Sequence, residues 1–150
     1  MKNDINIRLM TINDYEQVYS LWLSTPNMAL THLDDSKDGI GKYLERNSNT
    51  CFVAEKGGDI VGVILSGHDG RRGFIYHLAV MQSEHRQGIG SSLVNEAMSA
   101  LKREGINKVA LLVINENEKG NAFWEKHGFT TRDDLVYRNK AITEMMIINT

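Results

Sequence analysis

Cysteine and proline are nearly absent: Cys51 and Pro26 are the only ones in 150 residues. One cysteine cannot form an intramolecular disulfide, which excludes a disulfide-stapled fold and is typical of a reducing compartment. Cys51 opens an apolar run, residues 51–54, and buried cysteine behaves as a small hydrophobe. We therefore expect it in the core and not as a reactive thiol.

The sequence also lacks a strong charge of one sign and any long apolar run. The formal net charge is −2, so no global field favours nucleic acid or an anionic membrane. No window approaches the ~20 apolar residues of a spanning helix. The first residues do not show the apolar stretch of a signal peptide. We expect a cytoplasmic protein with neither nucleic acid nor membrane as a partner.

What is present is ordinary for a folded chain. The composition is 41% hydrophobic and 24% charged, and no internal repeat or low-complexity segment interrupts it. The length suits one core and is too short for two comfortable ones. We expect a single domain over residues 1–150.

Apolar periodicity predicts both helices and strands. Helices are expected from residue 13 or 14 to Pro26, where Asn13 or Asp14 caps the first turn, and then over 40–46, 89–103 and 118–127. Strands are expected over 7–11, 51–56, 60–66, 74–80, 108–114, 129–133 and 142–149. The run 108–114 is almost continuously apolar, which fits a strand covered on both faces.

This order of elements predicts an α/β fold with a mixed sheet. Residues 51–80 read as an antiparallel meander with turns at Gly57-Gly58 and at 68–73. The unit 74–114 is strand, helix, strand, so its two strands should be parallel with a right-handed crossover. We expect a mostly antiparallel sheet, one parallel pair and helices on both faces.

The most informative stretch lies where the strand 74–80 gives way to the next helix. Gly88 and Gly90 open that helix, whose first N–H groups are unpaired and carry partial positive charge. Glycine lets backbone approach a ligand closely, so the turn can cradle a pyrophosphate. Arg86 adds a cation, and Ser91 and Ser92 add hydroxyl donors.

Other phosphate-binding motifs fit this loop poorly. No Gly-Lys-Ser/Thr follows, so it is not a Walker sequence. Leu93 stands where a dinucleotide fingerprint has its third glycine or alanine, and the loop comes after a meander instead of the first strand. A strand-to-helix turn without a ligand stays open on the loop alone.

The chain resembles the GCN5-related N-acetyltransferase (GNAT) superfamily, most strongly over residues 74–129. The family's Arg/Gln-x-x-Gly-x-Gly/Ala loop is matched in its glycines by residues 85–90. Its Asn about seven residues before an aromatic, followed by Glu-Lys-x-Gly-Phe, is matched by Asn117 and by residues 124–129. Both motifs occur in the right order and on the expected elements.

The resemblance implies acetyl-coenzyme A as co-substrate and an amine as acceptor. It implies that the strands 74–80 and 108–114 splay apart and that the pantetheine arm pairs with backbone at Leu78, Ala79 and Val80. The implied pyrophosphate contacts are the N–H groups of Gln87, Gly88, Ile89, Gly90 and Ser91. A side-chain contact from Asn117 is implied as well.

Two positions depart from the family pattern. His85 replaces the first Arg/Gln of the loop, and only protonated histidine is cationic. Trp124 stands where the family usually has the tyrosine thought to protonate the leaving thiolate. An indole N–H donates a hydrogen bond but is not a useful acid. The usual general acid is therefore missing from its usual place.

For the chemistry, His77 is the first candidate base. A lysine-type amine has a pKa near ~10.4 and must lose a proton before it attacks, and a histidine with an ordinary pKa of ~6.5 suits that task. Tyr76 should point to the opposite face by strand alternation, and one of the two should face the cleft. Glu116 is a further candidate base, and Tyr137 a candidate acid. A packing role stays open for each.

The acceptor is less defined. Asp34, Asp35 and Asp38 can attract a cationic small molecule or peptide, although a solvated acidic loop is the alternative. A coenzyme A-binding module without catalysis, a different acyl group and a nucleotide-binding module are competing readings. The histidines show no metal-site spacing, so we expect no metal. The resemblance adds the expectation of a homodimer.

Overall fold

A five-stranded sheet in the order β1-β3-β4-β5-β6 forms the centre of the protein, in a computed structural model that describes residues 4–148. The first four strands pair antiparallel, and β5 and β6 pair parallel. The strands are β1 (Ile5–Leu9), β3 (Phe52–Lys56), β4 (Asp59–His68), β5 (Gly73–Val80) and β6 (Val109–Leu111). The predicted mixed sheet with one parallel pair is confirmed.

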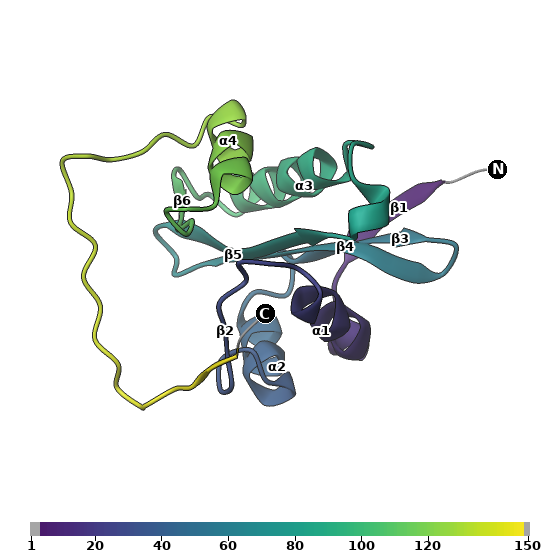
Figure 1. The fold of residues 1–150 in the computed structure, drawn as a ribbon, viewed down its shortest axis with the longest axis horizontal. Helices are drawn as coiled ribbons and strands as arrows, with labels where there is room; N and C mark the ends of the chain where they lie inside the picture. Colours follow the sequence, from purple (N-terminus) through teal and green to yellow (C-terminus); the bar gives the residue numbers. More distant parts are fainter. Residues whose placement is uncertain (1–3, 149–150) are drawn as a thin grey trace.

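Helices cover both faces of the sheet (Figure 1). α1 (Tyr15–Leu23) and α2 (Lys37–Arg46) lie on one face, and α3 (Ile89–Arg103) and α4 (Glu118–Lys126) lie on the other. Short 3₁₀ turns precede α1 (Ile12–Asp14) and α3 (Gln82–Glu84). No helix among residues 4–148 is long and apolar enough to cross a membrane.

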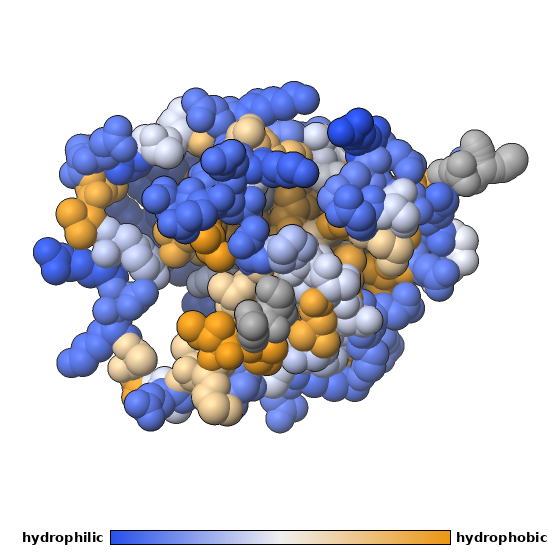
Figure 2. All heavy atoms as spheres, in the orientation of Figure 1, coloured by the Kyte–Doolittle hydropathy of each residue, from blue (hydrophilic) through white to orange (hydrophobic). Residues whose placement is uncertain are grey.

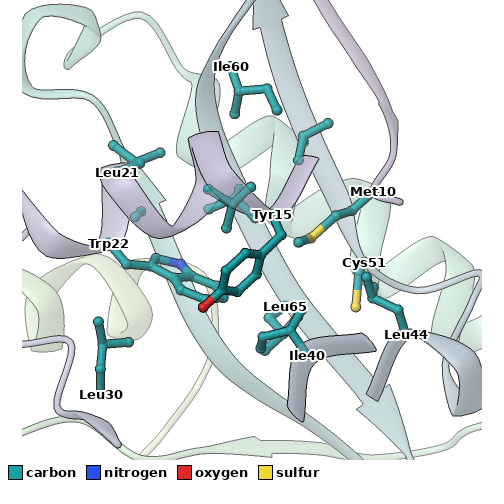
Figure 3. Packing of buried hydrophobic residues seen from close by; sticks show 14 residues of the cluster. Met10, Tyr15, Leu21, Trp22, Leu30, Ile40, Leu44, Cys51, Ile60 and Leu65 are labelled. Atoms are coloured by element: carbon teal, nitrogen blue, oxygen red, sulfur yellow. The ribbon is translucent and has the colours of Figure 1, made fainter. Parts of the chain in front are cut away.

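Two apolar clusters hold these layers together, one on each face. The α1 side is built around Trp22, which is 0% exposed, and Figure 3 shows Trp22 and Tyr15 reaching from α1 toward the sheet. The α3 side is built from the apolar stripe of α3, including Leu93 and Ala97. Cys51 is buried in the first cluster, and burial raises the pKa of its thiol to about 12. The expectation that Cys51 lies in the core is confirmed.

The predicted strand over 108–114 is too long. Only Val109–Leu111 pairs with β5, and Leu112 and Ile114 are 55% and 40% exposed. Ala110 of β6 is exposed and Val109 and Leu111 are only half-buried, so the strand is not covered on both faces. Residues 111–114 line a cavity instead, which accounts for an apolar run outside the core.

The two predicted closing strands are also wrong. Residues 129–133 form no strand, and within 142–148 only β7 (Ile147–Ile148) pairs, with β2 (Leu30–Thr31) in a separate two-stranded sheet. Asn149 lies outside the described residues. A strand needs a partner edge, and three residues of β6 offer little ladder. Residues 130–147 are all exposed, and 130–145 form an arch that stands apart from the body before the chain returns to β2 (Figure 2).

Candidate functional site

A cleft opens where β5 and β6 part. Their pairing ends at Ile75 and Leu111, while β5 continues to Val80 with β4 alone as its partner. The cavity beside this free edge measures about 1200 Å³. The splayed strand pair that the sequence resemblance implied is present.

The cavity is bounded by elements far apart in the sequence. Its walls come from β5, residues 111–114, the turn before α3, α4 and the segment 25–29 after α1. The following predicted site residues line it: Tyr76, His77, Leu78, Ala79, Val80, His85, Arg86, Gly88, Ile89, Gly90, Ser91, Asn117, Trp124 and Tyr137. Gln87 and Ser92 do not line it.

The turn before α3 concentrates backbone N–H groups. Arg86 and Gly88 both have left-handed backbone, with φ of 70° and 77°, and Gly88 is the N-cap of α3. Successive N–H groups in such a turn form an anion-binding concavity, reinforced by the helix dipole. Ser92 donates the first helical hydrogen bond, to Gly88. Within the described residues, the N–H groups of 88–91 have no recorded partner and remain available to a ligand.

Side chains from neighbouring elements fix the shape of this turn. The buried Glu84 carboxylate pairs with Lys56 Nζ at 3.0 Å and accepts a hydrogen bond from Gln87 Nε2 at 3.0 Å. His85 Nε2 donates to the carbonyl of Val80 at 2.9 Å. Gln87 and His85 therefore hold the turn through their side chains, a role the sequence did not reveal because Lys56 lies in another strand.

His127 does not line the cavity but contacts Ser91, which does, and the sequence reasoning missed this supporting role. Its Nδ1 donates to the Phe123 carbonyl at 2.9 Å, and its Nε2 lies 2.9 Å from Ser91 Oγ. The ring thus ties the end of α4 to the start of α3. No spacing signal links positions 91 and 127, so only the fold reveals this contact.

Asn117 and Trp124 occupy the α4 side of the cleft. Asn117 is the N-cap of α4, and its Oδ1 accepts from the Gly120 N–H at 3.0 Å, which leaves the Nδ2 donors. Trp124 packs edge-on against Phe123 and Phe129, each at 5.1 Å between ring centroids. A Cβ on Gly90 would lie 3.4 Å from the Phe123 ring, an ordinary contact distance, so α3 and α4 pack directly against each other at this point.

A β-bulge corrects the prediction that Tyr76 and His77 point to opposite faces. Leu65 pairs with His77, yet Ser66 pairs with Ile75, so Tyr76 is the extra residue on β5. A bulge shifts the alternation of side chains by one position. Tyr76 packs against Tyr43 of α2 and His77 against Trp22 of α1, with ring centroids 5.7 Å and 4.8 Å apart. Both side chains therefore face the α1–α2 side.

The three aspartates of the segment before α2 do not form one acidic surface. Asp34 and Asp38 are exposed, but Asp35 is 6% exposed, and its Oδ1 lies 2.8 Å from His77 Nε2. Its Oδ2 accepts from the Thr31 N–H at 2.8 Å. The expectation that Asp35 is an open attractor for a cationic acceptor is wrong, because hydrogen bonds occupy both of its oxygens.

The two tyrosines at this end of the cleft differ in setting. Partial burial raises the pKa of Tyr76 above its ordinary value of 10, and the charges of Tyr137 and Asp34 add to the rise. Tyr76 is thus a neutral phenol at physiological pH and can donate a hydrogen bond. Tyr137 comes from the exposed arch and lies at the cavity rim. Glu116 is exposed and does not line the cavity.

The described residues of the cleft form no group of side chains that could hold a metal ion. Over residues 4–148, no three His, Cys, Asp or Glu side chains lie close enough together to hold a metal ion. The polar groups that line the cleft include backbone N–H groups, hydroxyls, amides, cationic side chains and the imidazoles of His77 and His85. Such a set suits an organic phosphate ester and an amine.

The chain belongs to the acetyltransferase (GNAT) family, whose model matches residues 15–129. That range includes the turn before α3, α4 and every cavity-lining residue except Tyr137. An acetyltransferase of Sodalis glossinidius is 29% identical over 140 residues, covering 93% of this chain and 97% of the relative.

Solved structures share the fold. The PaiA N-acetyltransferase of Thermoplasma acidophilum, in complex with coenzyme A, has a TM-score of 0.75 and 22% identity, over 87% of this chain and 92% of that one. Ard1 of Thermoplasma volcanium has a TM-score of 0.75 and 23% identity, over 84% and 82%. The expected GNAT-like fold is confirmed.

Proposed function

We propose that the protein transfers an acetyl group from acetyl-coenzyme A to a primary amine, in a direct ternary complex without an acetylated enzyme. The observation that carries this proposal is the single cleft along the free edge of β5. Unpaired N–H groups lie at one end of that edge, and His77 lies farther along it. The cleft thus has a place for a phosphorylated donor and a place for a base.

The donor end fits coenzyme A in charge and shape. The N–H groups of residues 88–91 and the exposed Arg86 suit a pyrophosphate. Beyond the turn, β5 from Tyr76 to Ala79 has no paired strand on its β6 side and offers backbone groups to the amides of an extended pantetheine arm, while the Val80 carbonyl already accepts from His85. The complex of the Thermoplasma acidophilum PaiA N-acetyltransferase with coenzyme A supports this assignment.

The chemistry needs a neutral amine, a stabilised oxyanion and a leaving thiolate. His77 is the base, and a strand N–H near Ala79 or Val80 donates to the oxyanion. Trp124 cannot protonate the thiolate, so Tyr76, Tyr137 or water supplies that proton. Holding both reactants in one cleft supplies much of the rate, since effective molarities reach the order of 10⁵ M.

Two measurements test the proposal. Acetyl-coenzyme A and coenzyme A should raise the melting temperature, whereas ATP and NAD should not; a ligand at ~100 times its Kd stabilises by about 2.7 kcal/mol. An amine panel should then release free coenzyme A thiol. Acetylated enzyme detected by mass spectrometry before any acceptor is added would contradict direct transfer.

Trp124 favours a second candidate, a coenzyme A-binding module without catalysis. The indole occupies the α4 wall of the cleft and brings no acid. This candidate predicts the same melting shift with coenzyme A but no thiol release with any amine. Steady turnover with one amine would exclude it.

A further inference from the structure

His77 has a buried carboxylate partner that the proposed reaction does not by itself require. The Asp35 Oδ1 to His77 Nε2 distance is 2.8 Å, and the two side chains are 8% and 10% exposed. Trp22 packs its ring against the imidazole, with centroids 4.8 Å apart. This pair is therefore largely shielded from water, and its geometry is held by packing.

Asp35 is itself held in place from two sides. Its Oδ2 accepts from the Thr31 N–H at 2.8 Å, and its backbone carbonyl accepts from the Tyr15 hydroxyl at 2.8 Å. Tyr15 is a buried residue of α1. The carboxylate thus has one oxygen committed to the loop backbone and the other aimed at the imidazole.

This arrangement decides which nitrogen of His77 carries the proton. An ionised carboxylate only accepts hydrogen bonds, so Nε2 must be the donor. In the neutral ring the other nitrogen, Nδ1, then holds the lone pair. Among the described residues Nδ1 has no recorded hydrogen-bond partner, and the residue lines the cavity.

We infer that Asp35 is a positioning residue for acetyl transfer: it fixes the His77 tautomer so that Nδ1 is the basic nitrogen, and it stabilises the imidazolium that forms. This inference rests on the proposed function. As the amine nitrogen forms the new C–N bond, its proton passes to Nδ1. The C–S bond breaks with its electron pair on sulfur, which takes a proton from solvent or a tyrosine.

The Asp35→Asn variant inverts the hydrogen bond. The Thr31 N–H still needs an acceptor, so the amide oxygen faces Thr31 and the amide NH₂ faces His77. Nε2 then becomes the acceptor and the proton moves to Nδ1, which removes the base. We expect kcat to fall by about 10²-fold or more, the usual contribution of a general base, while both KM values change less than about threefold.

The His77→Gln variant removes the base but keeps a hydrogen bond to Asp35. Its amide can still donate to Asp35 but cannot take a proton, so the melting temperature should hold while kcat falls by a similar factor. The double variant should lose little more than either single variant, because the two residues act as one unit. Asp59→Asn makes the same charge change at an exposed position outside this cavity and should leave kcat unchanged.

The outcomes separate the two ideas. If wild type turns over an amine and Asp35→Asn keeps its kcat, or if the two losses multiply, the positioning role is wrong. If wild type binds coenzyme A but acetylates no amine, the proposed function fails. In that case ¹⁵N NMR of the His77 ring still decides the geometry: the proton should sit on Nε2 in wild type and on Nδ1 in Asp35→Asn, and an unchanged tautomer would overturn the inference.

Discussion

The two ends of the cleft are built by different means. At the donor end the binding groups are mainly consecutive backbone N–H groups, which Arg86 and Gly88 turn so that they converge at the start of α3 beside α4. The acceptor end is made from side chains of α1, of the segment before α2 and of β5, which meet only in the folded chain. Recognition at the donor end is made by backbone groups of one turn, which contacts from Lys56 and His127 brace, whereas the acceptor end consists of side chains that tertiary packing alone brings together.

Among the variants that test this difference between the two ends, Gly88→Ala should have the largest effect, a loss of coenzyme A affinity. A side chain in left-handed backbone costs roughly 1–2 kcal/mol, and here relief of that strain distorts the N–H cradle. We expect coenzyme A affinity to fall about tenfold or more by titration calorimetry. Loss of affinity without any change in kcat at saturating donor would confirm that the cradle binds and does not react.

Gly105→Ala is the matched control for that variant. Gly105 has φ of 84° at the other end of α3, and neither glycine has an atom within 4 Å of its added Cβ. Both variants should lose stability to a similar degree, about 2–4 °C in melting temperature for each kcal/mol. Equal loss of coenzyme A affinity in the two would contradict a local cradle.

The contrast also explains what the sequence could predict. The four helices, the β3–β5 meander and the glycine turn are local patterns, and all of them are present, although α1 ends at Leu23 before Pro26 and α2 begins at Lys37 instead of residue 40. The bulge at Tyr76, the Asp35–His77 pair and the Ser91–His127 contact depend on register and on distant segments, which no spacing encodes. The closing strands were expected from alternation alone, but alternation does not say whether a partner edge exists.

Asn117→Asp should have the next largest effect at the donor end. Asp keeps the N-cap hydrogen bond to Gly120 but replaces the Nδ2 donors with a negative charge facing the coenzyme A phosphates. We expect an unchanged melting temperature and roughly a fivefold weaker coenzyme A affinity that recovers with salt, since exposed charges are screened. Asn117→Ser caps without charge, and a loss as large as in Asn117→Asp would mean that the lost amide and not the charge is responsible.

At the acceptor end, Tyr76→Phe should change turnover and leave donor binding intact. The variant keeps the ring packing on Tyr43 and Phe74 but loses the hydroxyl, so we expect kcat to fall about threefold, the scale of one neutral hydrogen bond. Because the pKa of Tyr76 is raised above 10, its phenol stays protonated below pH 10, and the wild-type rate should show no decline from its ionisation there. A changed coenzyme A affinity in Tyr76→Phe would contradict the view that the donor and acceptor ends act independently.

The smallest expected effect belongs to Asp34→Asn. Asp34 is exposed, and the attraction between solvated charges is weak beyond a Debye length of about 8 Å at physiological salt. The acceptor KM should therefore rise less than about twofold, in contrast with the loss of kcat expected for its buried neighbour Asp35. Steady-state kinetics with one cationic amine, at low and at physiological salt, decide the point. A severalfold rise in the acceptor KM that vanishes with salt would contradict this expectation. It would mean that exposed charge, in addition to the packed side chains, binds the acceptor.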